Sequence, residues 1–119
     1  MTKSTIRRIA ASALAAVALA VPATSQAATS ASVTIEPQAG GFFGYVDSAD
    51  YECAAGRQVT LYKVKGNGKT KAVGTDIAQP NGDASMWSIN TNKKGKFVAK
   101  VKATGSCSAA SSPLAYAQV

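Results

Sequence analysis

The clearest alternation of apolar and polar residues along the chain lies at residues 96–103, KFVAKVKA. The four odd-numbered positions are apolar, and three of the four even-numbered positions are lysine. Successive side chains of a β-strand point to opposite faces of a sheet, so a period of two predicts a strand with one buried face and one face in water. We therefore expect this segment to be a strand whose lysines face solvent.

Six other segments are short, rich in strand-forming residues and separated by turn signals. Glycine and asparagine at 66–68 and 81–82 readily adopt the positive φ angles of tight turns, and residues 92–95 suit a hairpin loop. The patterns predict an all-β fold, an antiparallel Ig-like sandwich of about seven strands. The expected strands are residues 30–35, 42–46, 57–64, 71–77, 84–89, 96–103 and 114–119.

One of these strands contains a conflict. Lys63 and Lys65 share the parity of Val59 and Leu61, so a straight strand would aim two lysines at the core. Burying a charged side chain without a partner is costly. We expect either a bulge that switches the two faces or a strand end that overhangs the core.

The first 27 residues have the three-part pattern of a secretory signal peptide. A basic head precedes an uncharged apolar run, residues 9–21, which is shorter than the ~20 residues that span a bilayer. Small residues favour cleavage after Ala27, with cleavage after Ala28 as the alternative. The pair Arg7-Arg8 also occurs in twin-arginine signals, but the residue before it favours the general secretory route.

Residues 28–119 then form a single secreted domain. Three of the thirteen basic residues lie in the signal, so ten basic and six acidic side chains give the mature chain a net charge of +4. We predict no transmembrane segment in it, because no second long apolar stretch follows. The expected location is outside the cell, or loosely retained at the envelope.

Cys53 and Cys107 are the only cysteines. Export places them in an oxidising compartment, where a thiol pair tends to form a disulfide. Their spacing is far from C-x-x-C, and a zinc site would need two carboxylates because the chain has no histidine. We therefore predict a Cys53–Cys107 disulfide and no metal site.

Several short motifs together resemble a known pattern. They are C-x-x-G-R-x-V-T-L-Y-K from Cys53 to Lys63, VGTD at 73–76, an NG turn before Trp87, GKFVAKV at 95–101, and Cys107 followed by Ser111. Over residues 40–119 the chain is similar to small secreted actinobacterial proteins with prealbumin-like or carboxypeptidase-regulatory-like sandwiches, relatives of bacterial Ig-like domains. The resemblance implies a non-enzymatic module, and no catalytic residue is carried over from it.

The residues themselves also argue against catalysis. Without histidine, a Ser-His-Asp or Cys-His system is impossible. A carboxylate pair of glycosidase type would come from Asp47, Asp50, Glu52, Asp76 and Asp83, but the domain is small for a core plus a cleft. The first three of these also leave open a calcium site, although their spacing does not match an EF-hand and a solvated acidic loop is the preferred interpretation.

The basic residues fall on two expected hairpins and supply the candidate binding residues. One interpretation is a patch for an anionic polymer or surface, and the other is a solvated face that protects sheet edges. Specific nucleic-acid binding favours arginines interleaved with exposed aromatic residues. The mature chain contains one arginine, so we expect no such binding. The candidates are Arg57, Lys63, Lys65, Lys69 and Lys71 on the first hairpin and Lys100 and Lys102 on the second, which also carries Lys93, Lys94 and Lys96.

The aromatic residues predict the core. Phe42, Phe43, Tyr45 and Tyr51 are expected to pack in the core and at one end of the sandwich, with an exposed recognition patch as the alternative. Trp87 is expected at the centre, near the disulfide.

These observations lead to a secreted, non-enzymatic sandwich without a cofactor. Its role would be structural or binding, with an anionic cell-envelope polymer or an extracellular protein as partner. The alternative is a secreted protease or enzyme inhibitor that presents a rigid loop, either Gly66–Gly68 or Gln79–Asp83.

Overall fold

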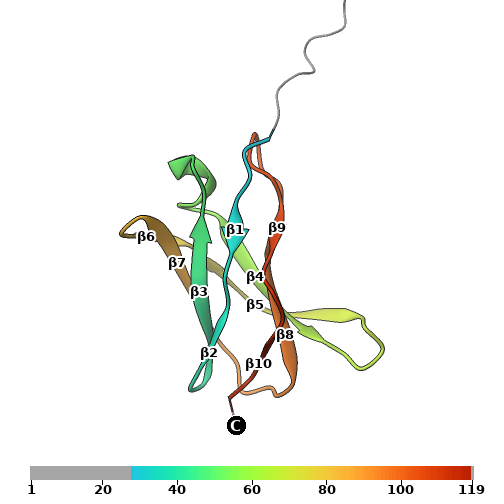
Figure 1. Ribbon diagram of the computed structural model, residues 1–119. Coiled ribbons are helices and arrows are strands. Elements are labelled where there is room, and N and C mark those ends of the chain that lie inside the picture. Colours follow the sequence, from blue (N-terminus) through green and yellow to red (C-terminus); the bar gives the residue numbers. More distant parts are fainter. Residues whose placement is uncertain (1–27, 119) are drawn as a thin grey trace, which may run out of the picture.

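The computed structural model describes residues 28–118 of the 119-residue chain (Figure 1). The expected signal peptide, residues 1–27, lies outside the described residues. The described part is all-β, with two sheets of antiparallel strands and a short 3₁₀ helix, η4 (Tyr51–Cys53). The predicted fold class is confirmed.

Each sheet contains five strands. In the first sheet the order is β1-β3-β7-β6, and β2 also pairs with β3. Its strands are β1 (Ser32–Val33), β2 (Glu36–Gln38), β3 (Gly41–Asp47), β6 (Gln79–Asn81) and β7 (Ala84–Asn90). In the second sheet the order is β10-β8-β4-β5, and β9 also pairs with β8. Its strands are β4 (Gln58–Val64), β5 (Thr70–Ile77), β8 (Lys96–Val101), β9 (Ala110–Ser111) and β10 (Ala115–Tyr116).

All seven expected strands have a counterpart, and three short strands, β2, β6 and β9, were not expected. Two of the three contain proline, Pro37 in β2 and Pro80 in β6. Proline lacks the amide proton of a strand interior and is tolerated where a sheet ends. Such segments therefore lack the sequence signature by which strands are identified.

The core lies between the two sheets. Phe42 of β3 and Phe97 of β8 are fully buried, and their ring centroids are 4.7 Å apart, which joins the two sheets directly. Val59 and Leu61 of β4 are also fully buried. The expected core position of Trp87 is confirmed, because this side chain has no exposed surface.

Trp87 is accommodated by a glycine on the neighbouring strand. Gly44 on β3 is the register partner of Trp87 on β7. The indole Nε1 of Trp87 donates a hydrogen bond to the carbonyl of Thr34, 3.2 Å away. A Cβ atom on Gly44 would lie 2.0 Å from that carbonyl oxygen and 2.8 Å from Nε1. The missing side chain at position 44 thus makes room for the largest residue of the core.

Of the two expected resolutions of the parity conflict in β4, the structure shows the overhanging strand end, because Lys63 is half-buried and Lys65 is exposed. A register irregularity is present, but the extra residue is Val73 on β5: Leu61 pairs with Gly74, and Tyr62 pairs with Ala72. Toward β8 the register of β4 is continuous, and Lys63 pairs with the buried Phe97. Lys63 therefore keeps the core-facing parity at the end of the sandwich.

The predicted Cys53–Cys107 disulfide is present, with the two Cα atoms 5.4 Å apart. Cys53 ends η4, in the connection from β3 in the first sheet to β4 in the second. Cys107 lies in the loop between β8 and β9. The bond therefore fastens the crossover between the sheets to a loop of the second sheet.

Reduction of the disulfide should destabilise the protein. The disulfide closes a loop with a sequence separation of 54 residues. By restricting the unfolded chain it stabilises the folded state by about 4 kcal/mol, and reduction removes this contribution. We expect the melting temperature to fall by at least about 15 °C when thermal unfolding is followed by circular dichroism with and without reductant. A double Cys→Ala variant should melt at the reduced temperature. An unchanged melting curve in reductant would contradict a stabilising role.

Gly44→Ala should also destabilise the protein, because the new methyl group collides with the Thr34 carbonyl and with the indole. We expect a loss of about 1–3 kcal/mol in the free energy of unfolding, measured by urea denaturation. Gly66→Ala is the matched control, since a Cβ there meets no atom within 4 Å. Equal stability of the two variants would show that the space beside Trp87 is not limiting.

Candidate anion-binding site

Five lysines line one groove at the end of the sandwich away from η4 and the disulfide. The groove has a volume of about 600 Å³. Three of the lysines belong to the β4–β5 hairpin and its turn, which extends away from the rest of the second sheet in Figure 1, and two belong to the loop between β7 and β8. The lining residues are Lys63, Lys65, Lys71, Val73, Asn92, Lys93 and Lys94.

Strand parity explains the hairpin's part of this arrangement. Lys63 and Lys71 are register partners, and Lys63 shares the inward side of β4 with Val59 and Leu61. The opposite sheet no longer covers this position fully, so Lys63 is half-buried and Lys71 is exposed. Two side chains on the inner side of the hairpin therefore border a hollow instead of filling a core.

A hydrogen bond joins the two segments of the groove. The ammonium of Lys63 donates to the backbone carbonyl of Lys94 over 2.6 Å. This bond holds the loop between β7 and β8 against β4 and uses one of the three protons that the ammonium can donate. The groove is thus bordered by two segments that this hydrogen bond connects.

The charges that line the groove all have the same sign. None of its seven lining residues is acidic, and Lys65, Lys71, Lys93 and Lys94 are exposed. Clustered ammonium groups raise the local positive potential and attract anions, and a concave wall focuses this field. The arrangement is suited to binding anionic groups.

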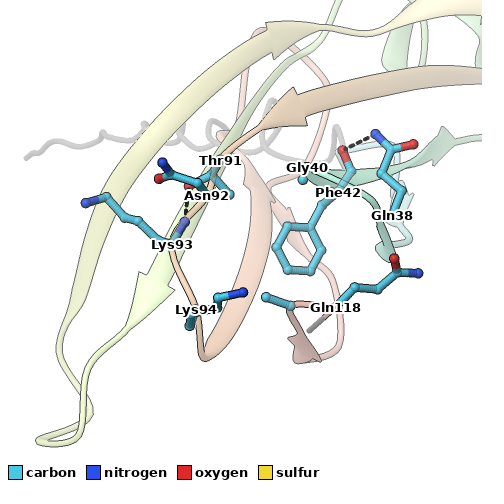
Figure 2. A pocket seen from close by; sticks show the side chains of 10 residues that line it. Gln38, Gly40, Phe42, Thr91, Asn92, Lys93, Lys94 and Gln118 are labelled. Atoms are coloured by element: carbon cyan, nitrogen blue, oxygen red, sulfur yellow. Dashed lines mark hydrogen bonds between the residues drawn. The ribbon is translucent and has the colours of Figure 1, made fainter.

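A second hollow, of about 220 Å³, adjoins this end of the sandwich (Figure 2). It shares Asn92, Lys93 and Lys94 with the lysine groove. The remainder of its lining is neutral. The residues are Gln38, Gly40, Gly41, Phe42, Thr91, Ala117 and Gln118.

The other candidate lysines do not line the groove. Lys100 lies on the outer side of β8, where its Nζ is 5.5 Å from the centre of the Tyr62 ring, within the range of a cation–π contact. Lys102 follows the end of β8, and Lys69 lies in the β4–β5 turn; both are exposed. The candidates thus separate into groove lysines and outer lysines, and Lys93 and Lys94 join the first set.

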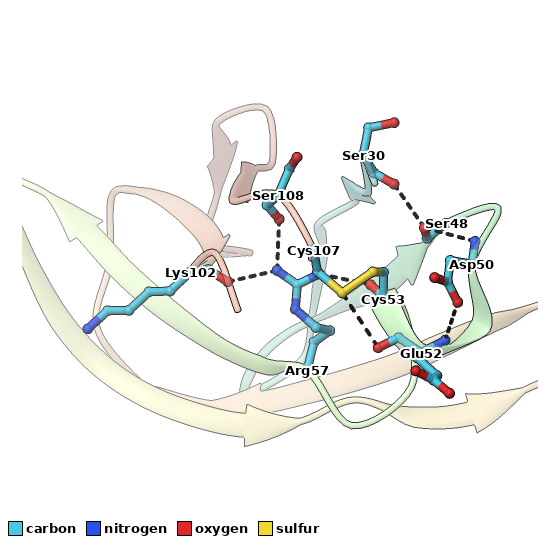
Figure 3. The surroundings of a disulfide bond; sticks show 9 residues. All are labelled: Ser30, Ser48, Asp50, Glu52, Cys53, Arg57, Lys102, Cys107 and Ser108. Atoms are coloured by element: carbon cyan, nitrogen blue, oxygen red, sulfur yellow. Dashed lines mark hydrogen bonds between the residues drawn. A yellow bond between two sulfur atoms is a disulfide. The ribbon is translucent and has the colours of Figure 1, made fainter. Parts of the chain in front are cut away.

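Arg57 differs from all the lysines because it is buried, with 4% of its surface exposed. Its guanidinium donates to three backbone carbonyls, those of Cys53 at 2.9 Å, Lys102 at 2.7 Å and Ser108 at 2.8 Å (Figure 3). Burial lowers the pKa of this group from its ordinary value. Arg57 is therefore a cross-link beside the disulfide, and a binding role for it stays a prediction.

Two of the acidic residues have structural partners. The Asp50 carboxylate accepts a hydrogen bond from the Glu52 amide and caps η4, and the Asp76 carboxylate accepts from the amides of Ile77 and Ser88. Within residues 28–118, no group of three or more histidine, cysteine or acidic side chains is placed to hold a metal ion. The alternative of a calcium site at Asp47, Asp50 and Glu52 thus gains no support.

The aromatic residues expected to pack together occupy three places. Phe42 is in the core, whereas Phe43 and Tyr45 have the opposite parity on β3, are half-buried and meet edge to face at 6.4 Å. Tyr51 lies on η4 and is 66% exposed. The aromatic group is therefore neither one core cluster nor one surface patch.

Comparisons with known proteins leave the family open. No protein-family model matches the sequence, and no curated protein or solved structure matches it either. The likeness to prealbumin-like domains stays a prediction. Among the described residues, no helix has both the length and the apolar character needed to cross a membrane.

The Arg57 cross-link can be tested by Arg57→Met. This change removes a charged donor from three carbonyls, so we expect a loss of about 2–4 kcal/mol in the free energy of unfolding, measured by urea denaturation. Lys69→Met removes the same charge from an exposed turn and should change stability by less than about 0.5 kcal/mol. Similar values for the two variants would contradict the structural role of Arg57.

Proposed function

We propose that the mature chain is a secreted, non-enzymatic β-sandwich module that binds an anionic polymer of the cell envelope in its lysine groove. The observation that carries this proposal is the meeting of five lysines, from two separate segments, around one hollow of about 600 Å³. The signal-like pattern of residues 1–27 supports export. The disulfide also supports it, because such bonds persist in oxidising compartments.

A polymer suits this groove better than a single small anion. An exposed ion pair contributes only about 0.2–1 kcal/mol, so one anion on one or two lysines would bind weakly. A chain with repeated charges engages several lysines at once, and each later contact benefits from the high effective concentration created by the first. The spread of the lysines over two segments matches that mode of binding.

The proposal includes no catalytic step. The groove offers ammonium groups and one amide side chain, whereas general-base catalysis ordinarily relies on an imidazole or a carboxylate. The resemblance to carboxypeptidase-regulatory-like domains points in the same direction, since it implies a non-enzymatic module.

The groove can be tested with paired variants of equal charge. Lys71→Ala with Lys93→Ala removes two groove lysines, and Lys100→Ala with Lys102→Ala removes two outer lysines. We expect the groove pair to reduce co-sedimentation with isolated bacterial cell walls at least fivefold, and the outer pair to reduce it less than twofold. Binding of the wild type should fade between about 50 and 500 mM salt, because the screening length shrinks over this range.

Two results would overturn this proposal. A larger loss in the outer pair would move binding to the outer side of β8. Absence of wild-type binding at any salt concentration would favour the inhibitor alternative, and inhibition assays against a protease panel would follow. The turn Gly66–Gly68 would be the first inhibitory loop to alter, since it ends the extended β4–β5 hairpin.

A further inference from the structure

The basic and acidic residues of the chain occupy different segments. Within residues 28–118, all nine lysines lie in segments 63–71 and 93–102, and neither segment contains an acidic residue. All six acidic residues lie outside these two segments, where the only basic side chain of the described part is the buried Arg57. Separated charges create strong local fields of both signs on a molecule whose net charge is small.

Folding places the separated charges at two ends of the sandwich. Because β3 and β7 are antiparallel, the start of β7 lies beside the end of β3, and the end of β7 leads into the loop that borders the lysine groove. In Figure 1, η4 and the β6–β7 turn lie away from that loop and from the turn of the β4–β5 hairpin. Four of the six acidic residues gather there, and we call this surface the acidic end. They are Asp47, Asp50, Glu52 and Asp83.

The acidic end is accessible to a partner. Asp47, Glu52 and Asp83 are exposed, and Tyr51 on η4 is 66% exposed. Tyr51 and Asp83 border one hollow of about 140 Å³, so η4 and the β6–β7 turn form a continuous surface. Lys102 also lies toward this end, but it follows β8 in the second sheet. Among the described residues, the hydrogen bonds that carboxylates accept come from backbone amides and none from a lysine ammonium.

The acidic end complements the lysine groove. The groove offers five ammonium groups and the apolar side chain of Val73, and the acidic end offers four carboxylates and an exposed tyrosine ring. Ammonium groups attract both carboxylates and the face of a tyrosine ring. Because the two surfaces lie at opposite ends of one molecule, they can meet only between two copies.

Charge also decides how two copies meet. A two-fold symmetric contact through either surface would face groove with groove, or acidic end with acidic end, and like charges repel. A head-to-tail contact pairs opposite charges and leaves a free groove and a free acidic end for further copies. The net charge of +4 opposes association. Salt screens this repulsion beyond about 8 Å under physiological conditions, which leaves the short contacts of the interface dominant.

We propose that the protein assembles head to tail, with the acidic end of one copy docked in the lysine groove of the next. Tyr51 is the apolar anchor of this contact, and the surrounding carboxylates pair with the groove lysines. Each exposed ion pair contributes little, so the assembly is sensitive to salt and forms at high protein concentration. The inference goes beyond the proposed function and does not rest on it, although an anionic polymer would compete for the same lysines.

Sedimentation equilibrium tests the assembly with two paired variants. Lys71→Ala with Lys93→Ala alters the groove, and Glu52→Gln with Asp83→Asn alters the acidic end. All four residues are exposed, so both variants should remain folded. At about 1 mM protein and about 50 mM salt, we expect the weight-average mass of the wild type to be at least about twice the monomer mass, and to return to the monomer mass at about 500 mM salt.

Both variants should remain monomeric under the conditions in which the wild type assembles. The groove variant lowers the net charge from +4 to +2, and the acidic-end variant raises it from +4 to +6. A general effect of net charge would therefore move the two in opposite directions. Lys100→Ala with Lys102→Ala matches the charge of the groove variant outside the groove, and it should assemble to within about twofold of the wild-type mass.

An equimolar mixture of the groove and acidic-end variants determines the direction of the contact. One variant keeps its acidic end and the other keeps its groove, so we expect a 1:1 complex and no larger species. A mixture without this complex, or a wild type that is monomeric in all conditions, would overturn the head-to-tail assembly. A monomeric wild type that still binds cell walls would leave the proposed function standing, whereas an assembling protein that binds no cell walls would overturn the proposed function alone.

Discussion

The contact between Phe42 and Phe97 is the point on which the remainder of the structure depends. It joins the two sheets, with the ring centroids 4.7 Å apart, inside a core that also buries Val59, Leu61 and Trp87. Phe97 is also the register partner of Lys63, and Phe42 also lines the second hollow. This contact therefore connects the core to residues of both hollows. A shift of either strand would displace the core and the candidate site together.

The two ends of the sandwich differ in construction. At one end the disulfide and the Arg57 guanidinium connect the same segments, the β3–β4 crossover and the loop after β8. Backbone carbonyls accept all three guanidinium bonds, so the buried cation is compensated by dipoles. At the other end the chain leaves its charges exposed and its hollows open. The stabilising cross-links and the candidate site thus lie at different ends of the sandwich.

The alternation of apolar and polar residues predicted the features that depend on strand parity, and it predicted few others. The seven expected strands, the core position of Trp87 and the disulfide all follow from local pattern and from cysteine chemistry. The short strands β2 and β6 could not be predicted in this way, because each contains a proline, a residue that argues against a strand in the sequence. Parity also identified Lys63 as the residue in conflict, although the irregularity that accompanies it lies on β5.

The candidate site depended on information that local pattern does not contain. Arg57 and Lys63 look alike in the sequence, since each is a basic residue of the same segment and parity. Only the tertiary structure shows that one is enclosed by three carbonyls and the other opens on a groove. The meeting of Lys93 and Lys94 with the β4–β5 hairpin likewise follows from the pairing of β4 with β8. The sequence signal for this part of the candidate site was a pair of consecutive lysines at a turn. Lysines at such a turn are ordinarily exposed to solvent without any binding role.

The groove is also the place where the chain departs from what stability alone would favour. An apolar side chain at position 63 would extend the core next to Phe97, and fewer lysines around the hollow would reduce repulsion in the free protein. Sequences usually satisfy local rules where nothing but folding is required, and they violate them where a site must be kept open. Lys63 breaks the parity rule, yet its bond to the Lys94 carbonyl also shapes the groove. The residue that fits the core least is thus the one that organises the candidate site, which is the arrangement expected if anion binding, and not packing, determines position 63.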